Sequence, residues 1–147
     1  MTDGRAEAPV AADLSVGDTG PEVVVSDLDR SDFVKYAGAS GDFNPIHYNE
    51  PLATAAGYES VFAQGMFTAG VAARAVADWF GLANVRSYGV RFQAQVWPGD
   101  TVTAVAEVTG VEVGGDVATV EADVLVTNQD GEAVVTGRAS AELPADR

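Results

Sequence analysis

The stretch that decides the fold is GMFTAGVAARAVADWF, at residues 65–80. Arg74 and Asp78 are its only charged residues, so the segment predicts a helix that is apolar nearly all round. Such a helix is stable in water when it is buried against the rest of the chain. Gly81 predicts its end, because glycine readily adopts the backbone conformation that closes a helix. We therefore expect one long, buried helix at the centre of the fold.

After this helix the apolar residues change from a helical to an alternating spacing. The alternation covers four segments, which are residues 88–96, 102–108, 118–126 and 133–141. Alternation predicts strands with one face on a core, and the short connections between them favour four strands in sequential order, an antiparallel meander. A sheet with one apolar face buries an apolar helix when it curls around it. The sequence thus predicts an α+β domain with an antiparallel sheet wrapped around a long central helix.

The first part of the chain carries shorter elements. Val23-Val-Val25 predicts a first strand, because β-branched residues favour extended backbone. Asp29 is a candidate N-cap for a helix that stops at Gly41. A second short helix is expected from about Pro51, which suits a first helical turn, to Gly57.

The length of 147 residues indicates a single domain. Residues 1–13 are rich in Ala, Asp, Glu and Gly without any period, and we expect a disordered lead-in there. The folded domain is then expected over residues 14–147. The opening residues also lack the continuous apolar stretch of a signal peptide, so the cytoplasm is the expected compartment.

Composition excludes several classes of function. The formal charge is −14 with only eight basic residues, which argues against nucleic acid and against an anionic membrane surface as partners. No apolar run reaches the roughly 18 residues of a membrane-spanning helix. Cysteine is absent and His47 is the only histidine, so a conventional metal site is not expected. No cofactor is indicated.

The most informative polar stretch is YAGASGDFNPIHYNEPLA, at residues 36–53. His47 lies five residues after Asp42, in a segment whose Gly41 and Pro45 favour a fixed, irregular loop. A carboxylate and an imidazole that converge on one water form a minimal general acid and base pair. The residue types alone also allow a structural interpretation, in which Asp42 caps a turn and His47 is simply packed.

A second candidate lies at Gly65, where the long helix begins. The first N–H groups of a helix have no partner within the helix, and its dipole favours negative charge nearby. The Gly65 N–H is therefore a candidate donor to a carbonyl oxygen that becomes negatively charged, as in an oxyanion hole. The alternative is that glycine at this position only permits close packing of the helix.

Together these stretches resemble the MaoC-like dehydratase family, also called hydratase 2. The signature of that family runs from an aromatic residue through small residues and Gly-Asp-x-Asn-Pro-x-His to a small residue six positions on, and it is present here from Tyr36 to Ala53. The likeness extends to the Gly65-Met66 helix start and to Tyr88-Gly-Val-Arg-Phe92. The overall order is similar to that of the B subunit of mycobacterial (3R)-hydroxyacyl-carrier-protein dehydratases.

The resemblance implies a hot-dog fold with Asp42 and His47 as catalytic residues and the Gly65 N–H as oxyanion donor. It implies reversible syn hydration of a trans-2-enoyl thioester, carried on coenzyme A or acyl carrier protein, to the (3R)-3-hydroxyacyl thioester. It also implies a dimer in which two sheets join edge to edge, as a homodimer or as a heterodimer with a related hot-dog subunit.

Further residues are candidates for binding substrate. Gln64, which replaces a histidine found in many relatives, and Met66 flank the oxyanion glycine. Asn44 is expected to hold the Asp42 loop, with substrate contact as the alternative. Tyr36 and Phe62 are candidates for lining an acyl tunnel, although aromatic residues at such spacing are more often core.

Two other functions remain open from the sequence. A hot-dog thioesterase would hydrolyse the same thioesters, but such enzymes generally lack the Gly-Asp-x-Asn-Pro-x-His arrangement. A non-catalytic subunit of a heteromeric dehydratase is the second alternative, and such a subunit would be expected to lose the Asp and His pair, which this chain keeps as Asp42 and His47.

Overall fold

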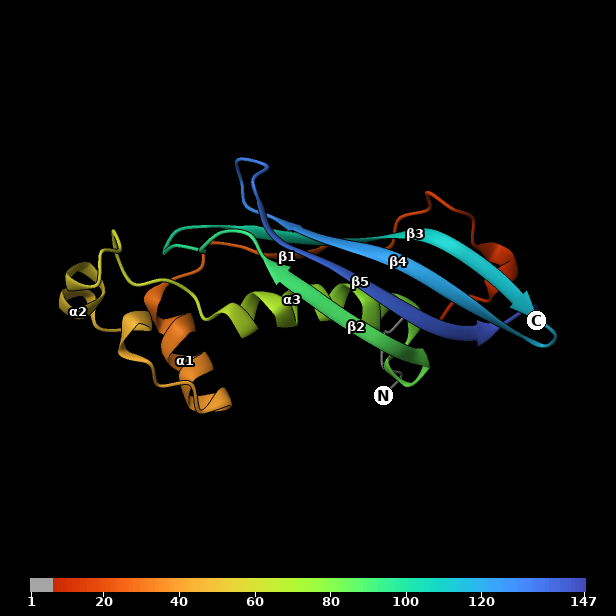
Figure 1. The fold of residues 1–147 in the computed structure, drawn as a ribbon, viewed down its shortest axis with the longest axis horizontal. Coiled ribbons are helices and arrows are strands. Elements are labelled where there is room, and N and C mark those ends of the chain that lie inside the picture. The colour runs from red at the N-terminus through yellow and green to blue at the C-terminus, as the bar shows by residue number, and fades with distance from the viewer. Residues whose placement is uncertain (1–6) are drawn as a thin grey trace.

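A computed structural model of the chain describes residues 7–147, with one antiparallel five-stranded sheet and three α-helices (Figure 1). The strands are β1 (Val23–Val25), β2 (Val85–Phe92), β3 (Val102–Gly114), β4 (Val117–Thr127) and β5 (Ala133–Pro144). The helices are α1 (Arg30–Ser40), α2 (Glu50–Ala55) and α3 (Gly65–Phe80). Short 3-10 turns occur at η1 (Ala11–Asp13), η2 (Pro45–His47) and η3 (Leu82–Asn84).

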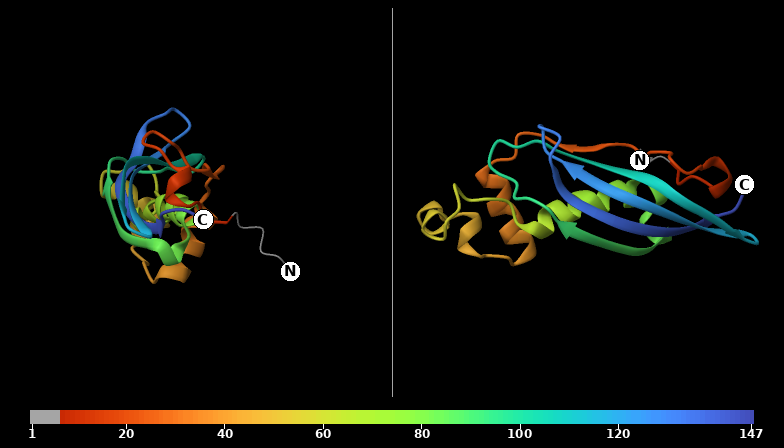
Figure 2. Two further views of the ribbon diagram at one scale, coloured as in Figure 1. Left: turned by 90° about the vertical axis from the view of Figure 1, so that its right-hand side faces the viewer. Right: turned by 45° about the horizontal axis from the view of Figure 1, so that its top comes forward.

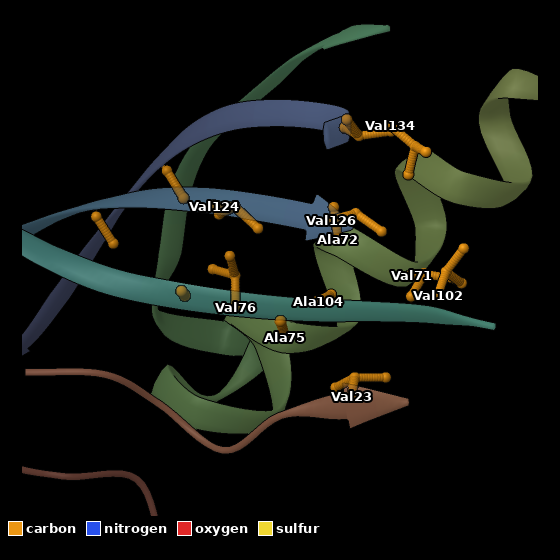
Figure 3. Close-up of a cluster of buried hydrophobic side chains, with 14 of the residues drawn as sticks. Val23, Val71, Ala72, Ala75, Val76, Val102, Ala104, Val124, Val126 and Val134 are labelled. Atoms are coloured by element: carbon orange, nitrogen blue, oxygen red, sulfur yellow. The ribbon is translucent and has the colours of Figure 1, made fainter. Parts of the chain in front are cut away.

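The sheet curves around α3, so the sequence prediction of a sheet wrapped on a long central helix is confirmed (Figure 2). Valine and alanine from both elements form the interface (Figure 3). Ala72 and Val76 on α3 are buried against strand residues such as Ala104 and Val126. Small side chains at these positions allow the helix to lie close to the sheet.

The helix is not buried all round, contrary to the prediction. Met66, Gly70, Arg74 and Asp78 are exposed and lie four residues apart, so they form one stripe along α3. A single curved sheet covers only part of the circumference of a helix. The stripe includes Met66, whose side chain is 63% exposed, and it therefore leaves apolar surface open in the single chain.

The strand order also differs from the predicted meander. Only β3, β4 and β5 are consecutive neighbours, and β2 pairs with β5 at the opposite edge from β1. Residues 93–101 carry the chain across from β2 to β3. Part of this crossing supports the segment before α3, because the Val96 carbonyl accepts a hydrogen bond from the Ala63 N–H at 2.8 Å. Alternation identifies strands but not their neighbours, which is why the sequence did not predict the crossing.

The two helices before α3 lie at one end of the molecule and position the loop between them (Figure 1). Asp29 and Asp32 form a capping box at the start of α1, as the sequence predicted for Asp29. The helix ends at Gly41, whose φ of 79° is left-handed, a conformation that favours glycine. Pro51 occupies the first turn of α2.

The N-terminal segment joins the fold earlier than expected. Ala11 in η1 is 2% exposed and belongs to the core, and the Ala12 N–H bonds to the Ala145 carbonyl at 2.9 Å. Residues 11–13 are therefore part of the folded unit, because one buried apolar side chain and one backbone bond fix them. The rest of the expected lead-in includes residues 1–6, which lie outside the described residues. None of the helices in residues 7–147 is long and apolar enough to span a membrane.

Candidate active site

His47 lies at the end of η2 with its imidazole held in one orientation. The side chain is 8% exposed, and its Nδ1 lies 2.8 Å from the Phe62 carbonyl oxygen. Because a carbonyl can only accept a hydrogen bond, Nδ1 carries the proton and donates it. In the neutral ring, Nε2 is then the atom with a free lone pair, so the histidine is prepared to act as a base through Nε2.

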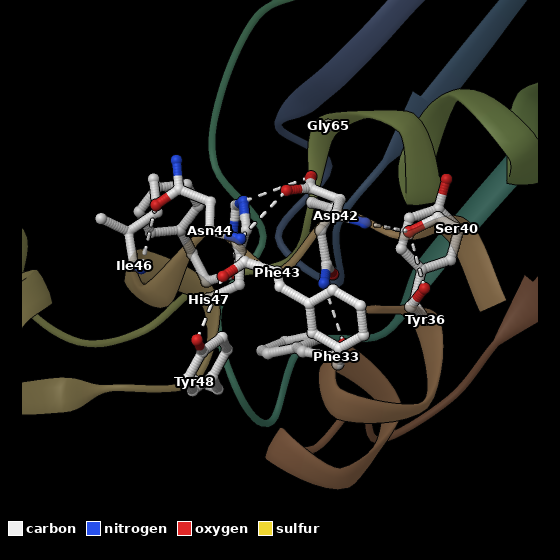
Figure 4. Close-up of polar contacts among 12 residues, drawn as sticks. Phe33, Tyr36, Ser40, Asp42, Phe43, Asn44, Ile46, His47, Tyr48 and Gly65 are labelled. Atoms are coloured by element: carbon white, nitrogen blue, oxygen red, sulfur yellow. Dashed lines mark hydrogen bonds and ion pairs between the residues drawn. The ribbon is translucent and has the colours of Figure 1, made fainter. Parts of the chain in front are cut away.

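Asp42 faces that Nε2 from the other side of the loop (Figure 4). Its Oδ1 accepts the Asn44 N–H at 3.2 Å, whereas its Oδ2 lies 3.7 Å from His47 Nε2. This separation is too long for a direct hydrogen bond, so the two acceptor atoms face each other without a bond between them. The carboxylate therefore both caps the loop, as the structural interpretation proposed, and forms half of a pair with His47.

Ser40 supports the Asp42 loop and was missed by the sequence reasoning. Its hydroxyl donates to the Tyr36 carbonyl at 2.7 Å and accepts the Asp42 N–H at 3.1 Å. It thus links the end of α1 to the first residue of the pair. A serine two positions before a functional aspartate, at a helix end, is a pattern that favours such local hydrogen bonds and was the available signal.

The segment from Phe62 to Gly65 brings the pair and the start of α3 together. The Phe62 carbonyl holds His47, and three residues later Gly65 begins the helix. Gln64 makes no side-chain cap, so the first N–H groups of α3 are not covered by it. Gly65 also lines a hollow of about 220 Å³ with Phe62 and residues 92–96. The helix start is therefore open beside the segment that orients the histidine.

The side chain of Gln64 does not take the expected position for substrate contact. It is fully buried, and its Nε2 donates to the Phe33 carbonyl in α1 at 2.8 Å. Its Oε1 is buried without a partner among the described residues. The glutamine thus ties α1, which leads to Asp42, to the residue that precedes Gly65, and the packing of α1 against this segment explains why it points inward.

The other predicted substrate residues lie in different environments. Phe62 is 8% exposed, and its ring meets the His47 ring edge to face at 5.1 Å between centroids. Tyr36 packs edge to face on Phe67 at 5.5 Å, and Met66 is mostly exposed. Asn44 accepts the Ile46 N–H through its side-chain oxygen at 3.3 Å, which supports the expectation that it holds the loop.

This arrangement can move protons and stabilise charge. A carboxylate oxygen and a neutral imidazole nitrogen face each other, and the helix start at Gly65 lies three residues after the carbonyl that holds the imidazole. Among residues 7–147 no group of three or more potential ligand side chains could hold a metal ion.

Comparisons with known proteins identify the family of this chain. The sequence profile of the family described as "MaoC like domain" matches residues 9–130. The chain is 32% identical over 121 residues to an (R)-specific enoyl-CoA hydratase of Rhodospirillum rubrum, covering 80% of this chain and 81% of that protein. It is 26% identical to mouse peroxisomal multifunctional enzyme type 2, of which it spans only 20% while 97% of this chain is matched.

Solved structures show the same architecture. An (R)-hydratase of A. caviae superposes with a TM-score of 0.75 at 27% identity, covering 89% of this chain and 98% of that one. A chain from the ChsH1-ChsH2 complex of Mycobacterium tuberculosis gives 0.74 at 28% identity, covering 88% and 98%. The hot-dog architecture that the resemblance implied is thereby confirmed, and the chain belongs to the MaoC-like domain family.

Proposed function

We propose that the protein catalyses reversible syn hydration of a trans-2-enoyl thioester to the (3R)-3-hydroxyacyl thioester, with the acyl group on coenzyme A or on acyl carrier protein. The observation that carries the proposal is the pair formed by Asp42 Oδ2 and His47 Nε2, 3.7 Å apart with Nδ1 fixed as the protonated nitrogen. Membership of the MaoC-like family and the named hydratase relatives support it.

In this mechanism one water molecule binds between the two acceptor atoms. His47 Nε2 or Asp42 Oδ2 removes a proton from the water as its oxygen bonds to Cβ, and a proton is returned to Cα on the same face. The sum of the two transfers is the addition of one water across the double bond. The fixed Nδ1–H bond to Phe62 keeps the imidazole in the tautomer that this step requires.

The thioester carbonyl gains negative charge as Cβ accepts the hydroxide. A carbonyl oxygen placed at the start of α3 would receive the Gly65 N–H and would lie in the favourable field of the helix dipole. A donor of this kind contributes about 3 kcal/mol to the transition state where it has been measured in other enzymes. Because the donor is main chain, the glutamine at position 64 leaves it unchanged.

The direct test replaces each member of the pair. Asp42→Asn and His47→Gln keep the size of the side chains and should each lower the hydration rate of crotonyl-CoA by roughly 100-fold or more. Glu112→Gln, which removes an exposed carboxylate on β3 away from the site, is the control and should retain the wild-type rate. A folded His47→Gln variant with near wild-type activity would rule out the mechanism, and release of free thiol by the wild type would instead indicate a thioesterase.

We also propose that the chain acts as a dimer of hot-dog subunits, either with itself or with a related subunit. Strand β2 is an edge strand with one side unpaired. It contacts α3 through the hydrogen bond from the Tyr88 hydroxyl to the Ala69 carbonyl, and α3 carries the exposed stripe with Met66. Unpaired edges and open apolar surface favour association.

A further inference from the structure

The outer face of the sheet, which points away from α3, carries side chains in ordered rows. One row crosses four neighbouring strands in register and consists of Glu107 on β3, Asp123 on β4, Arg138 on β5 and Gly89 on β2. These residues line a hollow of about 980 Å³, which we call the outer-face hollow. At Gly89 the hollow is open, because a Cβ at that position would meet nothing within 4 Å.

The next row supplies an apolar centre and a second base. It consists of Val105 on β3, Leu125 on β4, Thr136 on β5 and Arg91 on β2, and it lines the same hollow. Leu125 is 45% exposed, although alternation would allow a polar residue on this face. An exposed leucine at the floor of a hollow is the kind of surface that a partner covers.

Charge is divided sharply across the two rows. The acids Glu107 and Asp123 lie on β3 and β4, whereas the bases Arg138 and Arg91 lie on β5 and β2. The only ion pair between the two sides is Arg138 with Asp123 at 3.6 Å, and the Arg138 side chain is 91% exposed. Arg91 forms no ion pair with any residue of 7–147. One half of the hollow is therefore basic and the other acidic.

A face divided in this way is complementary to itself. Consider two copies with their outer faces together and a two-fold axis midway between the sheets. If the axis runs parallel to the strands, above the line between β4 and β5, it places β5 of one copy over β4 of the other. Arg138 then meets Asp123 of the second copy, and Leu125 meets Thr136. An axis perpendicular to the strands would instead place base over base. Both axes keep the strands of the two sheets aligned, as packed sheets do, so the charges decide between them.

From this division of charge we propose that the outer-face hollow binds a second copy of this chain, face to face. Around the axis, Arg138 and Asp123 of the two copies form a ring of four alternating charges, and such networks contribute more than isolated exposed pairs. Glu107 of the second copy occupies the space over Gly89, beside Arg91. The interface differs from the β2 edge and uses no residue of the Asp42 and His47 pair.

A charge-swap experiment tests the interface by mass in solution at physiological ionic strength, where repulsion between the acidic chains is screened. Arg138→Glu places an acid opposite Asp123 of the second copy, and Asp123→Arg places a base opposite Arg138, so either swap turns the central contacts repulsive. Each variant alone should have half the mass of the wild type by light scattering. The two swapped faces complement each other, so mixing the variants should restore the wild-type mass.

Two further variants complete the test. Gly89→Leu fills the hollow from a position where a side chain meets no atom of its own chain, and it should also halve the mass without changing the circular dichroism spectrum. Arg147→Glu, at an exposed arginine beyond the end of β5, is the charge-matched control for Arg138→Glu away from both proposed interfaces, and it should keep the wild-type mass. Equal masses for the wild type and both swaps would overturn the proposal, as would a mixture that stays at half mass.

Discussion

The hydrogen bond between His47 and the Phe62 carbonyl shows how one contact sets the chemistry of a side chain. A histidine in solution exchanges its proton between two nitrogens, whereas here a carbonyl acceptor at 2.8 Å holds the proton on Nδ1. The lone pair is thus directed at the space shared with Asp42. A pair of ordinary residues becomes an acid and base pair because its surroundings fix a tautomer.

Ser40 offers a test of this positioning at the level of one hydroxyl. Ser40→Ala removes the link between the Tyr36 carbonyl and the Asp42 N–H, and the proposed hydratase activity should fall about 10-fold, in kcat more than in KM, because misplaced catalytic groups lower the rate. Ser31→Ala, which removes a hydroxyl at the other end of α1, serves as the control. Equal kcat values for the two variants would show that Ser40 does not position Asp42.

Ionisation of the Tyr88 hydroxyl makes the stability of the fold depend on pH in the alkaline range. Burial against α3 raises the pKa of its hydroxyl to about 12, and the hydroxyl donates to the Ala69 carbonyl. The unfolded chain loses this proton near pH 10, so the stabilisation is complete below about pH 10 and is lost as pH rises towards 12. Since the side chain is 37% exposed, the effect is on the order of 1 kcal/mol.

The check is urea unfolding at pH 8 and at pH 11. Wild type should lose more stability between the two pH values than Tyr88→Phe, which has no proton to lose at this site. If both proteins lose the same amount, the Tyr88 hydroxyl does not titrate differently in the folded and unfolded states.

At the scale of elements, the packing of α3 depends on glycine at one contact with the N-terminal segment. A Cβ at Gly20 would lie 2.5 Å from the Trp79 ring near the end of α3, and the Gly20 N–H bonds to the Ala106 carbonyl on β3 at 2.9 Å. The segment before β1 therefore lies between the helix end and the sheet edge. Neither element can move away without breaking this contact.

Gly20→Ala should lower the free energy of unfolding by about 1–3 kcal/mol, because the added methyl group overlaps an aromatic ring in a packed region. Gly38→Ala is the matched control, since a Cβ there meets nothing within 4 Å and the residue lies inside α1. That change should raise stability by roughly 0.5–1 kcal/mol through helix propensity. Chemical denaturation of both variants measures the contrast, and equal effects would contradict the packing argument.

For the whole molecule, the single chain leaves two surfaces with the features of interfaces. One comprises the β2 edge with the exposed stripe of α3, and the other is the outer-face hollow on the opposite side of the sheet. Both result from the geometry of one curved layer on one helix, which buries only the inner face of the sheet and part of the helix.

Met66→Lys tests the first of these surfaces. The side chain is 63% exposed in the single chain, so the change should leave the fold intact while it places a charge in the proposed subunit contact. We expect a lower mass in solution by sedimentation. Val16→Lys, at an equally exposed apolar residue near the other sheet edge, should keep the wild-type mass, and identical behaviour of the two variants would argue against a contact through α3.

The sequence by itself determined the central helix, the strands and the pair of Asp42 and His47. These depend on local signals: the composition of residues 65–80, alternation along each strand, and a motif within one loop. The N-cap at Asp29 was predicted for the same reason, and the structure adds Asp32, three residues on, as its partner in a capping box.

Only the tertiary structure decided what each of these elements meets. It placed β2 beside β5 and not beside β3, left Met66 exposed, and turned Gln64 inward to the Phe33 carbonyl. The tautomer of His47 was decided in the same way, by a carbonyl 15 residues away. These contacts join parts of the chain that are far apart in the sequence. They depend on how the sheet and the helices cover one another, which is a property of the packed molecule and not of any single segment.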